Sequence, residues 1–391
     1  MPALRPELAA LVVGVQDALK AKTPDAALDK LGAASSLPQL TGKETEIIQR
    51  LRVVASIEAG KPAIAMASLE ALVAAPEVPT SEKTGLIENL ISLAQKQKDH
   101  QRVIDAAQLF NHVQAPPTRG AQLAVAQAHY FLKNYAQTVQ QINTVLAFTA
   151  GTSSATVAWQ VKPEEYVLRM LADSHTQMKN RAGYLEGLTL LVKHYPSQAY
   201  WSDYLSRHIS QLEASSPLTL DWYRLVRATQ NLAEVDDYLE YAQLALKAGF
   251  PQEAQSVLDL GLKSDVLGKG GSKPAVDALR AQVTRRAGED AGAVISLEQQ
   301  LAGAANGNAA AQLGDLHLAG GQWLLAHTLY LSALEKGGLR REELTRLRQG
   351  IALAQQGQKQ AAQTALASAG MSPSAQTLAQ AWSLWAGQAG K

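Results

Sequence analysis

Apolar residues recur along most of the chain with the three- and four-residue spacing of amphipathic helices. The segment 308–338 shows this pattern most clearly, because two such helices flank a Gly-Gly turn at residues 320–321. Counted from Gly307 as position 1, small residues occupy positions 8, 20 and 27, and Leu313 and Tyr330 occupy positions 7 and 24. Small residues let two helices cross closely, while larger ones fill the space toward the next pair. The segment therefore predicts a helical hairpin that stacks on neighbouring hairpins.

The same register returns elsewhere, which predicts a repeat and not one isolated hairpin. Counted from Glu165, Leu171 and Ala172 take positions 7 and 8, and Leu188 takes position 24. Hairpins with small residues at the crossing positions also begin near residues 119, 235 and 343. The predicted fold is an all-α solenoid of about nine or ten stacked hairpins, ending in a capping helix at 374–387.

The composition of successive stretches suggests how the solenoid is divided. The predicted parts are N-terminal hairpins at 1–148, a flexible loop at 149–161, central aromatic-rich repeats at 162–267, a Gly-rich loop at 268–274, and C-terminal repeats with the capping helix at 275–391. Within the last part, helices at 276–286 and 291–302 are predicted to form a less regular pair.

Composition also narrows the classes of function. Across 391 residues, 36 Lys and Arg against 35 Asp and Glu give a net charge of +1. This balance offers no basic surface for nucleic acid or for an anionic membrane. The chain has no cysteine, which excludes disulfides, Cys-ligated metals and a thiol nucleophile.

Candidate chemistry is sparse, and each instance has a plainer explanation. The stretch GKGGSK at 268–273 lacks the glycine spacing and the Gly-Lys-Ser/Thr order of a phosphate-binding loop, so it is interpreted as a flexible loop. The eight histidines form no metal-binding spacing, and no nucleophile motif is present. We therefore expect no enzymatic activity, no cofactor and no metal.

The register and its period of about 34 residues resemble tetratricopeptide repeat (TPR) proteins. Within 194–267, the blocks YP-x3-YW, DDYLEYAQLALKAGFPQEA and VLDLGL are similar to periplasmic TPR proteins of bacteria that are associated with TonB/ExbB/ExbD systems. This resemblance implies a non-enzymatic scaffold that assists outer-membrane uptake machinery. Two alternatives stay open: a solenoid associated with glycan or polysaccharide machinery, and a Sel1-like cytoplasmic adaptor suggested by NAAAQLGDLHLAG at 308–320.

In such arrays the first helix of each hairpin lines the concave surface with its positions 2, 5, 9 and 12. The aromatic residues at 195–223 either pack between hairpins or form an exposed patch. The predicted partner-binding residues are Gln127, Tyr130, Tyr166, Arg169, Asp173, Thr176, Trp201, Tyr204, Gln243 and Asp315. We expect a protein or peptide partner there. The Lys and Asn set with which some TPR proteins hold a C-terminal carboxylate is not present in register.

The first twenty residues predict an amphipathic helix with a proline in its first turn. They show neither the basic segment nor the cleavage site of a signal peptide. No apolar run reaches the roughly 20 residues that span a bilayer. We expect a periplasmic location from the resemblance, with the cytoplasm as the alternative, and no insertion into a membrane.

Overall fold

The computed structural model describes residues 4–149, 162–213, 216–368 and 372–388, without the side chains of 148–149 and 288–293. Within these ranges the secondary structure is entirely helical, with twenty α-helices and one short 3-10 helix. The prediction of an all-α repeat solenoid is confirmed. The predicted loop at 149–161 lies outside the described residues except for residue 149. The chain separates into two units, 1–187 and 188–391, and the division falls within α10 (Arg181–His194).

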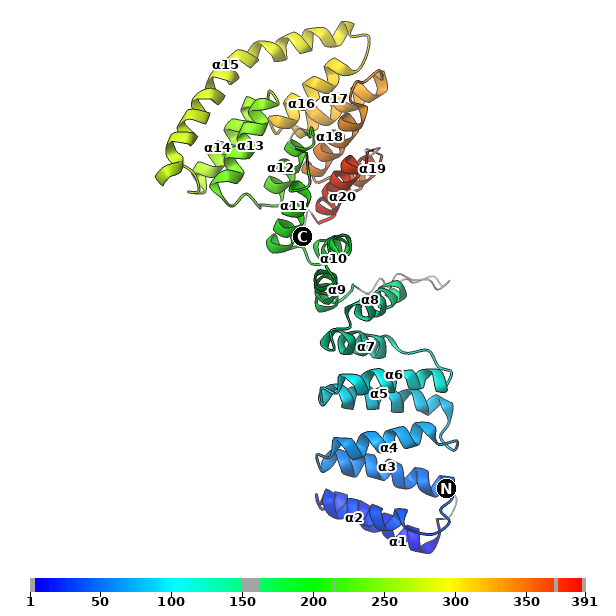
Figure 1. Ribbon diagram of the computed structural model, residues 1–391. Helices are drawn as coiled ribbons and strands as arrows, with labels where there is room; N and C mark the ends of the chain where they lie inside the picture. The colour runs from blue at the N-terminus through cyan, green and yellow to red at the C-terminus, as the bar shows by residue number, and fades with distance from the viewer. Residues whose placement is uncertain (1–3, 150–161, 214–215, 369–371, 389–391) are drawn as a thin grey trace. The chain divides into compact units, whose positions relative to one another are not determined.

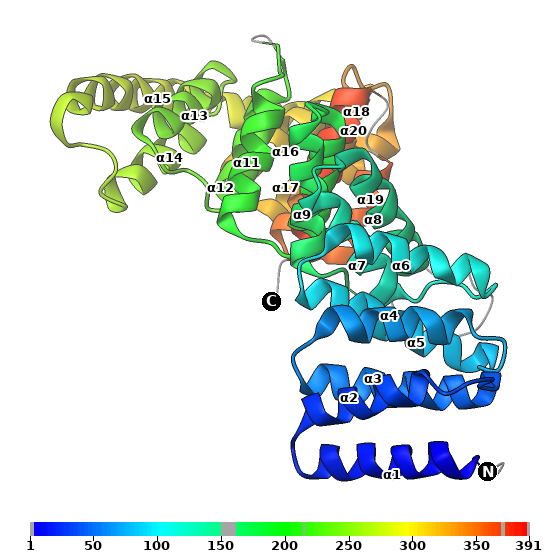
Figure 2. The ribbon, with the colours of Figure 1, turned by 60° about the horizontal axis from the view of Figure 1, so that its bottom comes forward.

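Unit 1 is a stack of antiparallel helix pairs, in which each helix packs on the helices before and after it along the chain (Figures 1 and 2). Its helices are α1 (Pro6–Lys20), α2 (Pro24–Ser35), α3 (Gly42–Glu58), α4 (Pro62–Ala74), α5 (Thr80–Lys96), α6 (His100–His112), α7 (Arg119–Phe131), α8 (Tyr135–Thr149), α9 (Glu165–Gln177) and the first half of α10.

Local signals in the sequence determine where the helices of unit 1 begin and end. Proline occupies the first turn of α1, α2 and α4, where a missing amide hydrogen costs nothing. Thr41 and Glu44 form a capping box at the start of α3. The helices of a pair join through a residue with left-handed backbone, such as Lys98 with φ 57° and Lys133 with φ 61°. This turn recurs from pair to pair, so successive hairpins keep a similar geometry.

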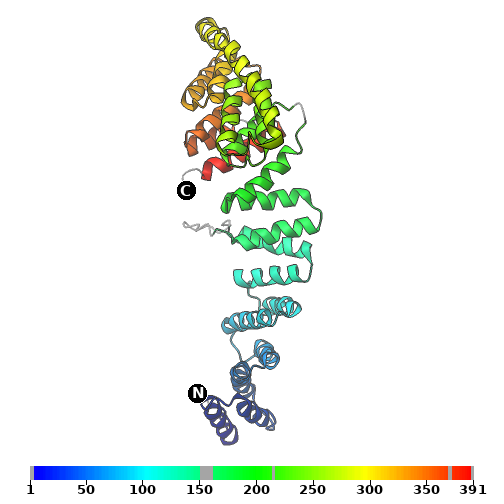
Figure 3. The same ribbon diagram turned by 90° about the vertical axis from the view of Figure 1, so that its left-hand side faces the viewer.

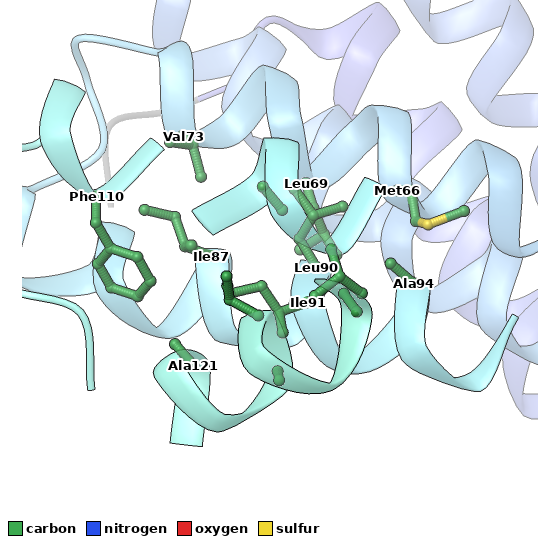
Figure 4. Packing of buried hydrophobic residues seen from close by; sticks show 14 residues of the cluster. Met66, Leu69, Val73, Ile87, Leu90, Ile91, Ala94, Phe110 and Ala121 are labelled. Carbon is green, nitrogen blue, oxygen red and sulfur yellow. The ribbon is translucent and has the colours of Figure 1, made fainter. Parts of the chain in front are cut away.

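The core of unit 1 is formed by apolar side chains packed between successive helix layers. Figure 4 shows the part from α4 to α7, where Leu69, Ile87, Leu90 and Phe110 are at most 2% exposed. Each such side chain contributes about 1.5–3 kcal/mol by leaving water. A hairpin buries its apolar face only against its neighbours, so the stack is stable as an array and not hairpin by hairpin.

In unit 2, the last helix packs against a helix from the early part of the same unit. Its helices are the second half of α10, α11 (Gln198–Ile209), α12 (Thr219–Ala228), α13 (Val235–Lys247), α14 (Pro251–Lys263), η1 (Gly270–Ser272), α15 (Lys273–Gly303), α16 (Asn308–Ala319), α17 (Trp323–Lys336), α18 (Glu342–Gln355), α19 (Lys359–Ala367) and α20 (Pro373–Gln388). The last helix, α20, packs against α18 and α19 and also against α12 (Figure 3).

Hydrogen bonds across long sequence separations confirm this closure of unit 2. The Trp382 indole donates to the Asp221 carbonyl oxygen at 3.3 Å, and the Gln388 amide donates to the Val192 carbonyl oxygen at 2.7 Å. Leu378 and Trp382 are fully buried, which confirms the predicted capping role of this helix. The cap covers the first helices of unit 2 as well as the last repeat.

The predicted pair of helices at 276–286 and 291–302 is wrong. One continuous helix, α15, spans 31 residues from Lys273 to Gly303. Gly288 and Gly292 are isolated, and a helix tolerates single glycines at a cost of about 1 kcal/mol each. Between residues 286 and 291, where the turn was predicted, the sequence has no proline and no Gly-Gly pair. α15 therefore passes along α14 and connects it to α16 (Figure 1).

The small residues at the predicted crossing positions lie where helices approach most closely. A Cβ added to Gly314 would lie 2.8 Å from the Tyr330 ring, and one added to Gly350 would lie 2.6 Å from the Leu366 side chain. Ala326 is 0% exposed. Such contacts are closer than van der Waals packing permits. The hairpins are therefore TPR-like in the packing that defines their register.

Candidate functional site

Six of the predicted partner-binding residues lie on the first helices of two successive hairpins in unit 1. We call this surface the α7–α9 face; it consists of Gln127, Tyr130, Tyr166, Arg169, Asp173 and Thr176. The structure connects two of them directly, because the Tyr130 hydroxyl donates to the Asp173 carboxylate at 2.6 Å. One layer earlier, the Gln95 amide of α5 donates to the Gln127 amide oxygen at 3.2 Å. Side-chain hydrogen bonds thus connect α5 to α7 and α7 to α9.

The hydrogen bond within the α7–α9 face keeps the Tyr130 phenol neutral. It raises the pKa of Tyr130 to about 12, so the phenol stays neutral and keeps donating at physiological pH. Arg169 is exposed and has no hydrogen-bond or ion-pair partner among the described residues. Tyr166 is 47% exposed. The face therefore offers a free guanidinium beside a partly exposed aromatic ring.

An exposed aromatic cluster at the end of α7 extends the α7–α9 face and was not predicted. Phe131 is 61% exposed and stacks on the His100 ring, with centroids 4.7 Å apart. Tyr130 contacts both Phe131 and Tyr135 edge-on, at 5.9 and 6.0 Å between centroids. Phe131 falls at position 13 of its repeat, outside the positions assigned to the concave surface. The closeness of three aromatic residues in HYFLKNY was the signal that could have identified it.

The predicted residues of unit 2 fall into different environments. Trp201 and Tyr204 are 4% and 3% exposed, and Trp222 is 1% exposed. The Trp201 indole donates to Gln388 at 3.1 Å, and burial raises the pKa of Tyr204 to about 12. These rings pack between helices and leave no face on which a sugar could stack. Gln243 is exposed on α13.

A group of charged residues lies inside unit 2, and we call it the ion network: Asp221, Arg224, Glu253 and Arg348, which are buried, and Asp315, which is half-buried. Arg224 donates one hydrogen bond to Asp221 at 2.6 Å. It donates two more to the Glu253 carboxylate, at 2.8 and 2.6 Å. Arg348 bonds Asp221 at 3.1 Å and Asp315 at 2.7 Å. The predicted partner-binding residue Asp315 is therefore engaged within the protein.

Electrostatics explain why the ion network stays charged. Burial by itself raises the pKa of Asp221, but the guanidiniums of Arg348 and Arg224 outweigh burial and lower this pKa below its usual value. Tyr241 and Tyr330 donate their hydroxyls to Glu253 and Asp315 at 2.8 and 2.7 Å. Nearly every charge is thus matched by an opposite charge or a donor, as burial requires.

The ion network connects helices that precede the long helix α15 in the chain with helices that follow it. Asp221 and Arg224 belong to α12 and Glu253 to α14, whereas Asp315 and Arg348 belong to α16 and α18. The network therefore holds the two groups of helices that α15 connects, and its role is structural. The i, i+3 pair of Asp221 and Arg224 in α12 was the local sign of it in the sequence.

Across 4–149, 162–213, 216–368 and 372–388, no group of three or more His, Cys, Asp or Glu is placed to hold a metal ion. None of the helices described there combines the length and apolar character needed to cross a bilayer.

Comparisons with known proteins add little to these observations. Neither the protein-family models nor the curated proteins gave a match to this chain. Among solved structures, a chain of the crystal structure of the APC/C hetero-tetramer Cut9–Hcn1 is 13% identical, with 96% of this chain and 80% of that chain covered at a TM-score of 0.23. A similarity at this TM-score supports no inference, so the description of the fold rests on the helices themselves.

Proposed function

We propose that the chain is a non-enzymatic scaffold that holds a protein partner on the α7–α9 face of unit 1, together with the aromatic cluster at the end of α7. The observation that carries this proposal is the exposure of Phe131 at the end of α7 and of Tyr166 and Arg169 one turn apart on α9; among the described residues Arg169 makes no hydrogen bond or ion pair. Aromatic residues and arginine are the side chains that most often anchor protein interfaces. The stacked hairpins supply a rigid support for such anchors.

Position on rigid helices supports the same proposal. Tyr130 and Asp173 fix each other through their hydrogen bond, so their side chains lose little further freedom when a partner binds. Pre-organised side chains give a larger share of their contact energy to affinity. The α7–α9 face therefore suits a partner segment that lies across α7 and α9.

The test compares partner recovery by three full-length baits in cell extract of the protein's own source. The face variant carries Phe131→Ala and Arg169→Ala. The control variant carries Ile295→Ala and Arg285→Ala, which remove an exposed apolar residue and an exposed arginine from α15. We expect at least one protein that wild type and control retain, and that the face variant loses about tenfold or more, since anchor residues contribute about 2 kcal/mol.

Circular dichroism of each bait shows whether its helices are intact before recovery is compared. Recovery of the same proteins in the same amounts by a folded face variant would contradict the proposal. Loss in both variants would place binding elsewhere on the chain.

We further propose that this scaffold acts in the envelope of a bacterial cell, within a TonB-type uptake assembly. The support is the similarity of the blocks within 194–267 to TPR proteins associated with such systems. Fractionation of the source cells tests the compartment directly. Recovery in the periplasmic fraction is expected, and recovery with cytoplasmic proteins would contradict the proposal and favour an adaptor inside the cell.

A further inference from the structure

A cavity of about 390 Å³ lies beside the ion network in unit 2. Its walls come from α12, α13, α14, α16, α17 and α18. The volume is within the range of small-ligand sites in proteins, about 300–1,000 Å³. Its ionisable lining residues other than Tyr241 are Arg224, Arg227 and Glu253, so the lining carries one more positive than negative charge.

The excess positive charge of the cavity belongs to one residue, Arg227. Arg224 and Glu253 neutralise each other through two hydrogen bonds, and the remaining bond of Arg224 goes to Asp221. Arg227 makes one hydrogen bond, from Nη2 to the Ser256 hydroxyl at 3.0 Å. It has no carboxylate partner among the described residues. A guanidinium carries five N–H donors, so most donors of Arg227 are available to a ligand.

A half-buried arginine without a counter-charge is costly unless something else meets its donors. A neutral side chain would fill the same wall of the cavity at a lower desolvation cost. The other polar side chains of the lining, Gln252 and Gln355, carry amides that can bind a peptide backbone. The lining therefore combines one guanidinium without a carboxylate partner among the described residues with two side-chain amides.

We propose that this cavity binds a carboxylate of a peptide segment from a partner protein, with Arg227 as the cation that receives it. One unpaired guanidinium matches the single charge and planar fork of a carboxylate, whereas phosphate groups are usually held by clusters of cations. Trp323, at the start of α17, lines the same cavity and is 37% exposed. Its ring provides an apolar surface for the residue next to that carboxylate. This site lies in unit 2 and does not depend on the α7–α9 face.

The experiment is an NMR titration of the full-length chain with short peptides. The probe is N-acetyl-Glu-Leu-amide, and its neutral counterpart is N-acetyl-Gln-Leu-amide. A third peptide, N-acetyl-Gln-Leu with a free C-terminus, separates a chain-terminal carboxylate from a side-chain carboxylate. We expect saturable binding of at least one carboxylate peptide, with a Kd of about 1 mM or tighter. The neutral peptide is expected to bind about tenfold more weakly.

Two cavity variants and one control variant test whether the peptide binds in the cavity. Arg227→Gln is expected to weaken the carboxylate peptide about tenfold. Arg285→Gln, which removes an exposed arginine of α15 that makes no hydrogen bond or ion pair among the described residues, is expected to leave the binding of the carboxylate peptide unchanged. Trp323→Ala is expected to weaken binding about threefold or more, and it carries the test if Arg227→Gln loses helicity.

Four outcomes would overturn the proposal. They are no saturable binding to wild type, equal binding of the neutral peptide, equal losses in Arg227→Gln and Arg285→Gln, and inorganic phosphate binding as tightly as the peptide. The last outcome would identify a general anion site instead of a carboxylate site.

Discussion

The two units of the chain differ in whether both partners of an ion pair are buried. In unit 1, Arg50 connects α3 to Glu82 of α5 at 2.6 Å, with side chains 39% and 49% exposed. In unit 2, Asp221 joins Arg224 and Arg348 with side chains 0%, 5% and 7% exposed. The same type of repeat therefore forms an open stack held by an apolar seam in one unit and a closed unit with a charged interior in the other.

This difference predicts that removing one charge of an ion pair destabilises the two units by different amounts. An exposed ion pair contributes about 0–1 kcal/mol, because water and salt already solvate its charges. A buried charge that loses its partner keeps the cost of desolvation without compensation. Unit 2 should therefore be sensitive to single charge deletions inside the ion network, whereas unit 1 should tolerate the loss of one exposed ion pair.

The largest effect is expected for Asp221→Asn, which removes the carboxylate shared by Arg224 and Arg348. We expect the free energy of unfolding of unit 2 to fall by about 3–5 kcal/mol. The matched change in unit 1, Glu82→Gln, should cost at most about 1 kcal/mol. Urea unfolding followed by hydrogen exchange in each unit measures both. Equal losses in the two variants would contradict the contrast between exposed and buried pairs.

A smaller effect separates tightly packed from open glycines. Gly314→Ala places a methyl group 2.8 Å from the fully buried Tyr330 ring and should destabilise unit 2 by about 1–3 kcal/mol. Gly85→Ala in α5 meets no atom within 4 Å and should stabilise unit 1 by about 0.5–1 kcal/mol through helix propensity. Thermal unfolding gives both signs. A stabilising Gly314→Ala would show that the crossing position does not require a small residue.

The smallest effect concerns acid stability at the start of unit 1. The hydrogen bonds that Glu44 accepts from the Arg5 guanidinium and the Thr41 amide lower its pKa from 4.5 to about 2. Because the pKa is lowered in the folded state, this stabilisation is present above pH 4.5 and is lost as the pH falls toward 2. Denaturant titrations of Glu44→Gln should show a weaker pH dependence across this window than wild type. An unchanged profile would remove Glu44 as its source.

Most of the helical architecture could be predicted because its signals are local. The period of small and large residues, as at Gly314 and Tyr330, predicts which helices cross closely and is confirmed by their contacts. The capping helix was predicted from Leu378, Trp382 and Trp385; the first two are buried, and Trp385 is half-buried. The continuity of α15 was missed because isolated glycines neither force nor forbid a turn, so the packing of α14 and α16 decides.

The candidate site was predictable only in part. The α7–α9 face followed from repeat positions, yet the exposure of Phe131 depends on how the turn after α7 meets its neighbour His100. The ion network could not be predicted from the sequence, because Asp221 and Arg348 are 127 residues apart. They lie on α12 and α18, which precede and follow α15 in the chain. A repeat pattern predicts which neighbouring helices pack together, but not which residues so far apart in the sequence form an ion pair. For the same reason, the hydrogen bond from Trp201 to Gln388 had no local signal.

The most direct test of the central claim compares hydrogen exchange in two core variants. Phe110→Ala in unit 1 and Trp382→Ala in unit 2 each remove a fully buried ring, at about 3–5 kcal/mol. If unit 1 is an open stack and unit 2 is closed by α20, Phe110→Ala should speed exchange mainly in α4 to α7. Trp382→Ala should speed exchange in α12, 161 residues earlier in the chain, as much as in α18 to α20. Unchanged exchange in α12 would contradict the closure of unit 2.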